Sequence, residues 1–364
     1  MSVTNDVVTD QRVNKVARTL RSIGAEITVI GRKRRNSIPF KPDKFNVKLF
    51  RLIINKGPLF YAVYNLRAFF YLVSHRFDIL VANDLDTLPA NYLASKIKRA
   101  KLVYDSHEYF TEVPELQGRK FVQKTWKLIE RFILPKIKYA CTVNDSIARI
   151  YCRKYGVKML TIRNLPYCNQ QEENADIYLT YKGKLILYQG SVNMGRGLEL
   201  VIKSMKHVNN ATFLIIGDGY IMESLKQLCT DLNLHDKILF TGRMPFNKLS
   251  SYTKKADLGI SLEENLGLNY YYALPNKLFD YIKANVPVLV SDFPEMGKIV
   301  KKYDIGLTTL STDPLEIAGL INYMLNDQDN IRKWKKNLLN ATKDLCWESE
   351  EQKLKEMYKT IISA

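Results

Sequence analysis

Strand-like and helix-like segments alternate along nearly the whole chain, and the alternation lapses once, near the middle. Runs rich in β-branched residues predict strands, whereas apolar residues at helical spacing predict helices. The first half is expected to form strands at residues 26–30, 77–82, 100–105 and 140–143, with helices at 10–20 and 86–98. The second half is expected to form strands at 184–189, 211–216 and 238–240, with helices at 198–205 and 221–232. This alternation predicts parallel sheets with helices on both faces.

A polar, acidic segment at residues 170–176 separates the two runs. A chain of 364 residues exceeds one ordinary hydrophobic core and fits two domains with a cleft. We therefore expect doubly wound α/β domains at residues 1–168 and 182–345. A last helix within 346–364 carries Leu354, Met357, Tyr358 and Ile361 at helical spacing, so it has one face to bury. The sequence leaves open which domain it covers, and packing on the first is one possibility.

Cysteine usage and hydropathy restrict the compartment. The five cysteines are odd in number and contain no CxxC pair, so neither a disulfide framework nor a thiolate zinc site is indicated. No uncharged apolar run reaches the roughly 18 to 20 residues that span a bilayer. We expect a cytoplasmic protein.

The net charge of +18 belongs entirely to the first half of the chain. Residues 1–170 contain 31 Lys and Arg against 13 Asp and Glu, whereas residues 171–364 contain 24 of each class. Basic side chains between Arg32 and Arg76 are interleaved with aromatic ones, a combination that suits an anionic membrane surface. Solubility alone is the simpler reading. No nucleic-acid-binding signature accompanies the charge, so we expect no nucleic acid partner.

Loops that follow strands in parallel sheets are where ligands bind. The loop after 184–189 contains Gly190, Ser191, Arg196 and Gly197 immediately before a helix. Glycine permits close approach of the backbone, and an arginine can contact two phosphate oxygens at once. The strand at 211–216 ends in Gly217-Asp218-Gly219. On its own, each loop is also compatible with a simple turn.

A third segment, residues 268–281, contains Pro275-Asn276-Lys277 followed by Asp280. Proline suits the first turn of a helix, which would direct the amides of Asn276 and Lys277 toward an anion. Asp280 lies about one helical turn further on, where its carboxylate would accept hydrogen bonds from a ribose. As an isolated feature, Asp280 would instead be a solvated helix acid.

In the first half, Asp105-Ser106-His107-Glu108 directly follows a buried strand. His107 is one of only four histidines and sits where a residue lining the cleft would lie. A structural role for it is about as well supported as a functional one.

These loops, the opening residues 3–13 and the segment 142–148 (Thr-Val-Asn-Asp-Ser-Ile-Ala) resemble the family 4 retaining glycosyltransferases of bacterial cell-surface polysaccharide assembly. The resemblance runs over nearly the whole chain and is most specific at 184–300. It implies the GT-B fold, in which two Rossmann-like domains face a central cleft, with the donor site in the C-terminal domain and the acceptor site in the N-terminal one.

The resemblance implies the following residue roles. The donor site would contain Gly190, Ser191, Arg196, Gly217, Asp218, Gly219, Arg243, Leu274, Asn276, Lys277 and Asp280. The acceptor side would contain Asn5, Asp6, Arg12, Asp105, His107 and Glu108. The catalytic groups would be His107, Arg196 and Lys277.

Two positions depart from the family pattern. The family usually carries two glutamates eight positions apart, where this chain has Tyr272 and Asp280. A basic pair commonly clamps the diphosphate, and here Ser191 occupies the earlier position while Arg196 is kept, so Lys277 would supply the second charge. The resemblance implies a reaction without a protein nucleophile, a metal or another cofactor, although Asp84-Leu85-Asp86 spells a DxD sequence. The leaving diphosphate would take the acceptor proton.

The expected function is transfer of a sugar, from UDP or GDP, to a glycan or a lipid-linked glycan at the inner face of the cell membrane. The nucleotide-sugar is a co-substrate in this reading. The alternatives are a catalytically silent binding or scaffold protein of the same fold and a nucleotide-sugar epimerase.

Overall fold

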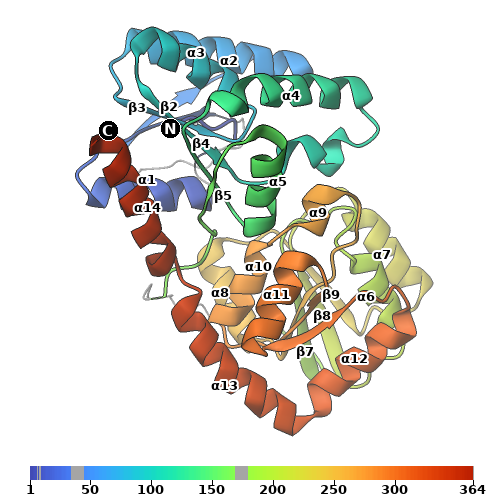
Figure 1. Ribbon diagram of the computed structural model, residues 1–364. Helices are drawn as coiled ribbons and strands as arrows, with labels where there is room; N and C mark the ends of the chain where they lie inside the picture. The colour runs from blue at the N-terminus through green and yellow to red at the C-terminus, as the bar shows by residue number, and fades with distance from the viewer. Residues whose placement is uncertain (6, 8–9, 34–44, 169–178, 364) are drawn as a thin grey trace. The chain divides into compact units, whose positions relative to one another are not determined.

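The computed structural model describes residues 1–5, 7, 10–33, 45–168 and 179–363. The chain divides into two compact units (Figure 1). The first comprises Met1–Asn164 together with Glu348–Ala364, and the second comprises Leu165–Trp347.

The first unit is built on a parallel sheet whose centre is the N-terminus of the chain. Ser2 forms single parallel bridges to Ile30 on one side and to Ala82 on the other. These bridges join two groups of strands into one sheet. In order across the sheet, the strands are β2 (Asn46–Phe50), β1 (Thr28–Arg32), then β3 (Ile79–Asn83), β4 (Lys101–Ser106), β5 (Tyr139–Thr142) and β6 (Leu160–Thr161).

Helices pack around this sheet, and several begin at the residues that cap them. Asp10 accepts a hydrogen bond from the amide of Val13 and starts α1, while Asn144 caps α5 in the same way. The helices of the unit are α1 (Gln11–Ser22), α2 (Gly57–Ser74), α3 (Leu88–Lys98), α4 (Lys120–Ile133), α5 (Asp145–Tyr155) and α14 (Trp347–Ser363). Short 3-10 turns lie at Phe110–Glu112 (η1), Pro114–Leu116 (η2) and Leu134–Lys136 (η3). In α14, Leu354, Tyr358 and Ile361 are buried, and the Nζ of Lys101 donates to the carbonyl of Ile361 at 2.6 Å.

The second unit contains a six-stranded sheet in which each neighbouring pair is parallel. Its order is β12 (Gly306–Thr309), β11 (Val288–Ser291), β10 (Leu258–Ser261), β7 (Lys184–Gln189), β8 (Ala211–Ile216) and β9 (Ile238–Gly242). Its helices are α6 (Leu198–Ser204), α7 (Met222–Asp231), α8 (Phe246–Lys255), α9 (Leu268–Tyr271), α10 (Asn276–Lys283), α11 (Pro294–Tyr303), α12 (Pro314–Asn326) and α13 (Gln328–Asp344).

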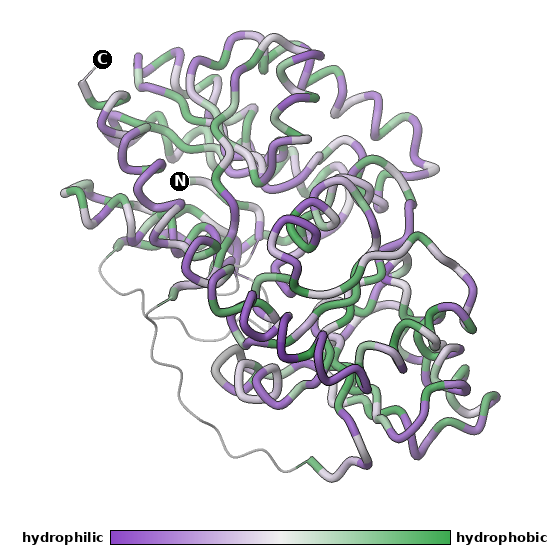
Figure 2. The backbone as a smooth tube through the Cα atoms, turned by 60° about the horizontal axis from the view of Figure 1, so that its bottom comes forward, coloured by the Kyte–Doolittle hydropathy of each residue, from purple (hydrophilic) through white to green (hydrophobic). Residues whose placement is uncertain are grey.

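Strand β7 shows why helices cover both faces of this sheet. Ile186 and Tyr188 lie in one hydrophobic core, whereas Leu185 and Leu187 lie in another. Alternate side chains of a strand point to opposite faces, so a strand that is apolar throughout requires cover on both. In Figure 2 hydrophilic and hydrophobic residues alternate along the helical turns, as expected of helices with one buried face. The predicted doubly wound α/β class is confirmed.

Both sheets follow the same strand order. The first strand of each unit lies in the middle, the next strands are added on one side of it, and the later strands are added on the other side. In the second unit this switch point lies between β7 and β10, and in the first unit it lies between the N-terminal segment and β3. Ligands of doubly wound sheets bind outside the carboxyl ends of the strands at this point. The loops after β7, β10, β3 and the N-terminal segment are thus the places to look for a site.

Candidate active site

Glycines bring three loops of the second unit close together at the switch point. A Cβ at Gly197 would collide with the carbonyl oxygen of Leu262, and one at Gly217 would collide with that of Gly190. Gly197 also has a φ of +67°, which favours glycine. The loops after β7, β8 and β10 are therefore in backbone contact, and no larger residue would fit at either position.

The centre of this site is a buried carboxylate shared by two cations. Oε1 of Glu263 lies 3.0 Å from Nζ of Lys277 and 3.3 Å from Nη1 of Arg196. The other oxygen, Oε2, accepts a hydrogen bond of 2.9 Å from Ser261. The side chain of Glu263 is fully buried, and those of Lys277 and Arg196 are 8% and 20% exposed. Arg196 and Lys277, predicted as donor-site and catalytic residues, are brought together in this way.

Aromatic rings support both cations. The Arg196 guanidinium lies 4.5 Å from the ring centre of Tyr270, and Nζ of Lys277 lies 4.1 Å from that of Tyr188. Cations over ring faces gain electrostatic stabilisation that partly replaces lost water. The two positive groups are thus held in fixed positions beside the glycine loop.

Burial and charge act in opposite directions on these groups. Burial alone would raise the pKa of Glu263, but Lys277 and Arg196 outweigh it and lower that pKa. Burial lowers the pKa of Lys277 to about 8, although Glu263 opposes this shift. The carboxylate is therefore charged at neutral pH, and Lys277 is the group that loses its proton first. Two cations and one carboxylate leave an excess of one positive charge, which suits a phosphate group.

The other predicted donor residues surround this centre less tightly. Gly190, Ser191, Asp218, Arg243 and Asn276 are exposed, while Leu274 and Gly219 are half-buried and Gly217 is buried. Asp218 accepts a hydrogen bond from the amide of Gly219 at 2.8 Å, which shapes that turn. Helix α10 begins at Asn276, so Pro275 stands immediately before the helix instead of within its first turn.

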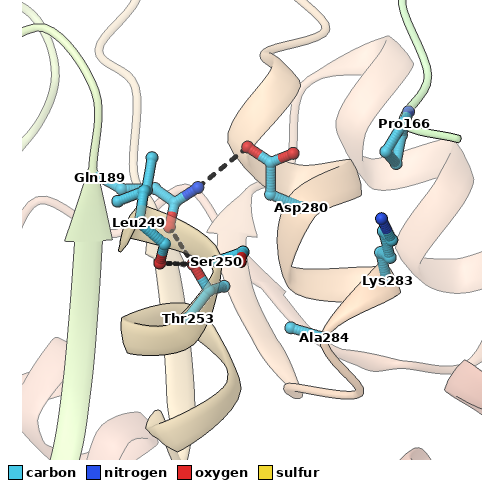
Figure 3. A pocket seen from close by; sticks show the side chains of 8 residues that line it. All are labelled: Pro166, Gln189, Leu249, Ser250, Thr253, Asp280, Lys283 and Ala284. Atoms are coloured by element: carbon cyan, nitrogen blue, oxygen red, sulfur yellow. Dashed lines mark hydrogen bonds between the residues drawn. The ribbon is translucent and has the colours of Figure 1, made fainter. Parts of the chain in front are cut away.

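Asp280 lies on α10, one turn beyond Lys277. Its Oδ2 accepts a hydrogen bond of 2.9 Å from Nε2 of Gln189, and Oε1 of Gln189 accepts one of 2.7 Å from Thr253 (Figure 3). Asp280 borders a small cavity of about 20 Å³, whose lining also includes Pro166 and Lys283. The acid that the resemblance assigns to a ribose is therefore anchored to the last residue of β7.

The first unit gathers acids around a histidine at its own switch point. The Nδ1 and Nε2 atoms of His107 lie 3.4 Å from Asp84 and 3.5 Å from Asp105, respectively. The backbone amide of His107 donates to Asp84 at 2.7 Å. Asp84 has a φ of +62°, in the left-handed region that aspartate tolerates better than most residues. The loop after β3 and the loop after β4 are tied together by these contacts.

A buried arginine secures this cluster. Arg12 on α1 donates from Nη2 to Asp105 at 2.6 Å and from Nη1 to the carbonyl of Ile162 at 2.6 Å. Arg12 is 3% exposed, so its charge is directed to Asp105 and not to solvent. The predicted acceptor-side residue Arg12 thus acts in this structure as a brace between α1, β4 and the segment after β6.

The charges in this cluster follow from these contacts. Burial alone would raise the pKa of Asp105, but Arg12 and His107 lower it far below its usual range. Burial alone would lower the pKa of His107, but Asp84 and Asp105 raise it. Because Arg12 keeps Asp105 ionised, we assign His107 as protonated at neutral pH. Burial raises the pKa of Asp86 to about 7, although the hydrogen bond from Thr4 opposes the shift.

The remaining acceptor-side predictions have different settings. Asn5 is exposed and Glu108 is half-buried. The carbonyl of Glu108 accepts a hydrogen bond from the hydroxyl of Ser106 at 2.8 Å, which shapes the loop of His107. Asp6 lies outside the described residues.

Sequence reasoning missed Glu263 and gave no role to Asp84 or Asp86. Each follows the carboxyl end of a strand, the same signal that identified His107. Asp84 and Asp86 flank the fully buried Leu85, which indicates a loop held against the core. The two cationic partners of Glu263 left no local signal, because they lie 67 and 14 residues away in the sequence.

The basic residues between Arg32 and Arg76 are in part engaged internally. The Arg32 guanidinium lies 4.4 Å from the ring centre of Phe60 and is buried, and that of Arg67 lies 5.2 Å from the ring centre of Phe50. Residues 34–44, which carry several of these cations, lie outside the described residues.

Two family models together match most of the chain. The model described as Glycosyltransferase Family 4 matches residues 11–164, and the model described as Glycosyl transferases group 1 matches residues 169–340. These ranges coincide closely with the two sheets.

Curated relatives and a solved structure agree with these matches. An uncharacterized glycosyltransferase of Methanocaldococcus jannaschii is 27% identical over 48% of this chain and 45% of its own length. The O-antigen chain mannosyltransferase RfbU of Salmonella typhimurium is 25% identical over 61% of this chain and 65% of its own length. The chain thus matches about half to two thirds of the length of these relatives. Anabaena HepE, solved in complex with UDP-glucose, shares 15% identity at a TM-score of 0.72, covering 99% of this chain and 98% of HepE.

The structural likeness establishes the GT-B fold, and the family models assign each half of the sequence. The chain belongs to the GT-B glycosyltransferases, with a family 4 region at its N-terminus and a group 1 region at its C-terminus.

Proposed function

We propose that this protein transfers a sugar from a nucleotide-sugar, with UDP or GDP as the nucleotide, to a glycan or lipid-linked glycan of the cell surface. The observation that carries the proposal is a pair of cations, the buried Lys277 and the half-buried Arg196, fixed by Glu263 beside the glycine loop after β7. This arrangement has an excess of positive charge, and the diphosphate of a nucleotide-sugar supplies the negative charge that balances it.

In this proposal the diphosphate lies against Gly190 and the start of α10. Lys277 approaches this loop closely, since its Cε lies 3.7 Å from where a Cβ of Gly190 would be. The absence of a side chain at Gly190 leaves room for phosphate oxygens near both the backbone and Nζ of Lys277. Asp280 then accepts hydrogen bonds from the ribose in place of the one it receives from Gln189.

The proposed reaction retains the anomeric configuration. The bond between the anomeric carbon and the diphosphate oxygen breaks, and the acceptor oxygen bonds to the same face of the sugar. The leaving diphosphate takes the proton of the acceptor hydroxyl, so the protein supplies no nucleophile. Arg196 and Lys277 stabilise the charge that develops on the diphosphate, and Glu263 holds them in position before the donor arrives.

We assign the acceptor side to the cluster around His107. A protonated imidazole donates hydrogen bonds to sugar hydroxyls, and Asp84 and Asp86 accept them. We propose no metal and no cofactor besides the nucleotide-sugar, as the family resemblance implies.

Two named proteins support the choice of substrates. HepE was solved with UDP-glucose, and RfbU is named as an O-antigen chain mannosyltransferase. We propose a cytoplasmic location at the inner face of the membrane, with the basic first unit making the peripheral contact. Among the residues described, no helix is both long and apolar enough to cross a bilayer.

The test begins with thermal unfolding in the presence of UDP, GDP, CDP or ADP, because a ligand that binds only the folded state raises the melting temperature. The nucleotide that stabilises the protein selects the sugar donors for transfer assays, and NMR of the product reports its anomeric configuration. Arg196→Ala and Lys277→Ala should each reduce the stabilisation at a given nucleotide concentration, whereas Lys226→Ala, which removes an exposed cation on α7, should keep it.

Each other outcome contradicts a stated part of the proposal. Donor binding without transfer to any acceptor would favour a silent binding protein. Conversion of the donor alone to another nucleotide-sugar would favour an epimerase. An inverted product would refute the retaining mechanism while leaving sugar transfer intact.

A further inference from the structure

A second, strongly basic hollow lies in the first unit, at the edge of the sheet opposite to His107. It has a volume of about 410 Å³ and is bordered by the end of α3, the first residues of β4, the turn η3 and the start of β5. Because β4 and β5 are parallel, their amino ends meet here, whereas Asp105 and His107 lie at the carboxyl end of β4. The hollow is thus separate from the acceptor cluster.

Five cations line the hollow and no acid does: they are Lys96, Arg99, Lys101, Lys136 and Lys138. Within the described part of the chain, none of them forms an ion pair with a carboxylate. Lys101 is half-buried and donates to the carbonyl of Ile361, a neutral partner. Like charges within a Debye length of about 8 Å repel one another at physiological salt. An anion bound in the hollow would relieve this repulsion.

Arg99 adopts an unfavourable backbone conformation at the end of α3. Arg99 ends α3 with a φ of +53°, in the left-handed region where glycine is the favoured residue. Its amide donates to the carbonyl of Ser95, so the helix end needs the conformation but not the guanidinium. A glycine would cap the helix equally well, and the arginine adds only charge at the mouth of the hollow.

Exposed apolar side chains border these cations. Phe132 on α4 is 62% exposed, and its ring centre lies 3.3 Å from Nζ of Lys136. Leu93 and Ile97 on α3 are 53% and 59% exposed, and Leu93 neighbours both Lys96 and Ile97 at helical spacings of three and four. Cations beside exposed apolar groups characterise surfaces that bind at the boundary between lipid headgroups and acyl chains.

We propose that this hollow binds the phosphodiester headgroup of an anionic phospholipid, with Leu93, Ile97 and Phe132 entering the acyl boundary. Lys96, Arg99 and Lys136 contact the headgroup oxygens, while Lys101 and Lys138 contribute at the floor and rim. The inference rests on the membrane contact proposed above and assigns it to a site. That site differs from the basic segment 32–76, where Arg32 and Arg67 stack on internal rings.

A lipid fits these residues better than a nucleic acid does. Phosphates of a nucleic acid would use the cations alone, and Leu93 and Ile97 would contribute nothing to affinity. For an anionic lipid, both the cations and the apolar side chains contribute. Variants of the two classes therefore distinguish these ligands.

The experiment measures co-sedimentation of the full chain with vesicles of phosphatidylcholine, with and without phosphatidylglycerol. The triple variant Lys96→Gln, Arg99→Gln, Lys136→Gln should bind phosphatidylglycerol vesicles about 100-fold more weakly, since each basic residue near the surface contributes about 1 kcal/mol. The matched control Arg18→Gln, Arg21→Gln, Arg153→Gln removes three exposed charges of the same unit and should bind like the wild type. The variant Leu93→Ser, Ile97→Ser should also bind more weakly.

Several results would overturn the proposal. Equal losses in the triple variant and its control would show that only net charge matters. If the Leu93→Ser, Ile97→Ser variant bound vesicles as tightly as the wild type does, and also bound single-stranded DNA with similar affinity, a nucleic acid would be the favoured ligand. Saturable binding of glycerol phosphate that vesicles do not displace would favour a free phosphate ligand. Nucleotides should raise the melting temperature of the wild type and of every one of these variants equally. If nucleotides stabilised none of the proteins, the donor assignment would fail, whereas the lipid proposal is judged by vesicle binding alone.

Discussion

Replacing Glu263 by Gln is the sharpest test of how the donor site is held together. The substitution keeps the shape of the side chain and removes the charge that faces Arg196 and Lys277 at 3.3 and 3.0 Å. Breaking a buried ion pair from one side costs about 3–5 kcal/mol, because the remaining charge is left without compensation. Lys277 can release its proton more readily than an ordinary lysine, so we expect the lower end, about 3 kcal/mol. In a unit of this size that corresponds to a fall in melting temperature of about 6–12 °C.

Thermal unfolding followed by circular dichroism measures this change. Glu264→Gln is the matched control, because Glu264 is the exposed neighbour and should change stability by no more than about 0.5 kcal/mol. A saturating nucleoside diphosphate should raise the melting temperature of Glu263→Gln by more than that of the wild type, since the ligand restores the missing negative charge. If Glu263→Gln unfolded together with Glu264→Gln, or gained no more from the ligand than the wild type, the shared-carboxylate argument would be refuted.

Three further predictions concern charge. By calorimetry, Arg196→Ala and Lys277→Ala should each weaken diphosphate binding by about 1.5–3 kcal/mol, and unchanged affinity in both would refute the assignment. Because protonated Lys277 binds the anion and its pKa is about 8 in the empty site, affinity should fall toward tenfold per pH unit above that value; Lys277→Arg should remove this dependence. The pKa of Asp105 is lower in the folded than in the unfolded state, so its ionised carboxylate stabilises the fold above the unfolded pKa of about 3.9, and this contribution is lost as the pH falls from there toward the folded pKa. In urea unfolding, the stability of Asp105→Asn should therefore decline less steeply with falling pH than that of the wild type.

The sequence predicted those parts of the fold whose signal is local. The expected strand at 184–189 coincides with β7, because an apolar run bounded by Gly183 and Gly190 has no other ready conformation. The helix expected from residue 10 begins at its Asp10 cap, as α1. In contrast, α2 (Gly57–Ser74) carries apolar residues on all sides, so no periodicity marks it.

The parts that the sequence did not predict depend on contacts between distant residues. In isolation, Glu263 belongs to a polar stretch after a short strand, and its role appears only when α10 and the loop after β7 meet it. The basic hollow has the same origin, since Lys136 and Lys138 reach Lys101 through the pairing of β4 with β5. Residue spacing along the chain does not reveal either of these sets of long-range contacts.

The two switch points differ in the charges of the side chains that line them, and this difference fits a donor site in one unit and an acceptor site in the other. In the second unit, two cations share a carboxylate and the excess charge is positive. In the first unit, acids surround a single histidine, and Arg12 compensates one of them from behind. A diphosphate finds its counter-charges only in the former, whereas neutral hydroxyl groups find both donors and acceptors in the latter.

Glu263 also explains how two buried cations persist in the empty site. Without it, burial would favour neutral Lys277, and a donor would have to bind and protonate that group in one step. With it, the lysine and arginine are charged and positioned in advance, and the diphosphate joins a network that already exists. The carboxylate weakens the net attraction for the anion but removes the cost of reorganising the site, and such preorganisation is what stabilises charge that develops during a reaction.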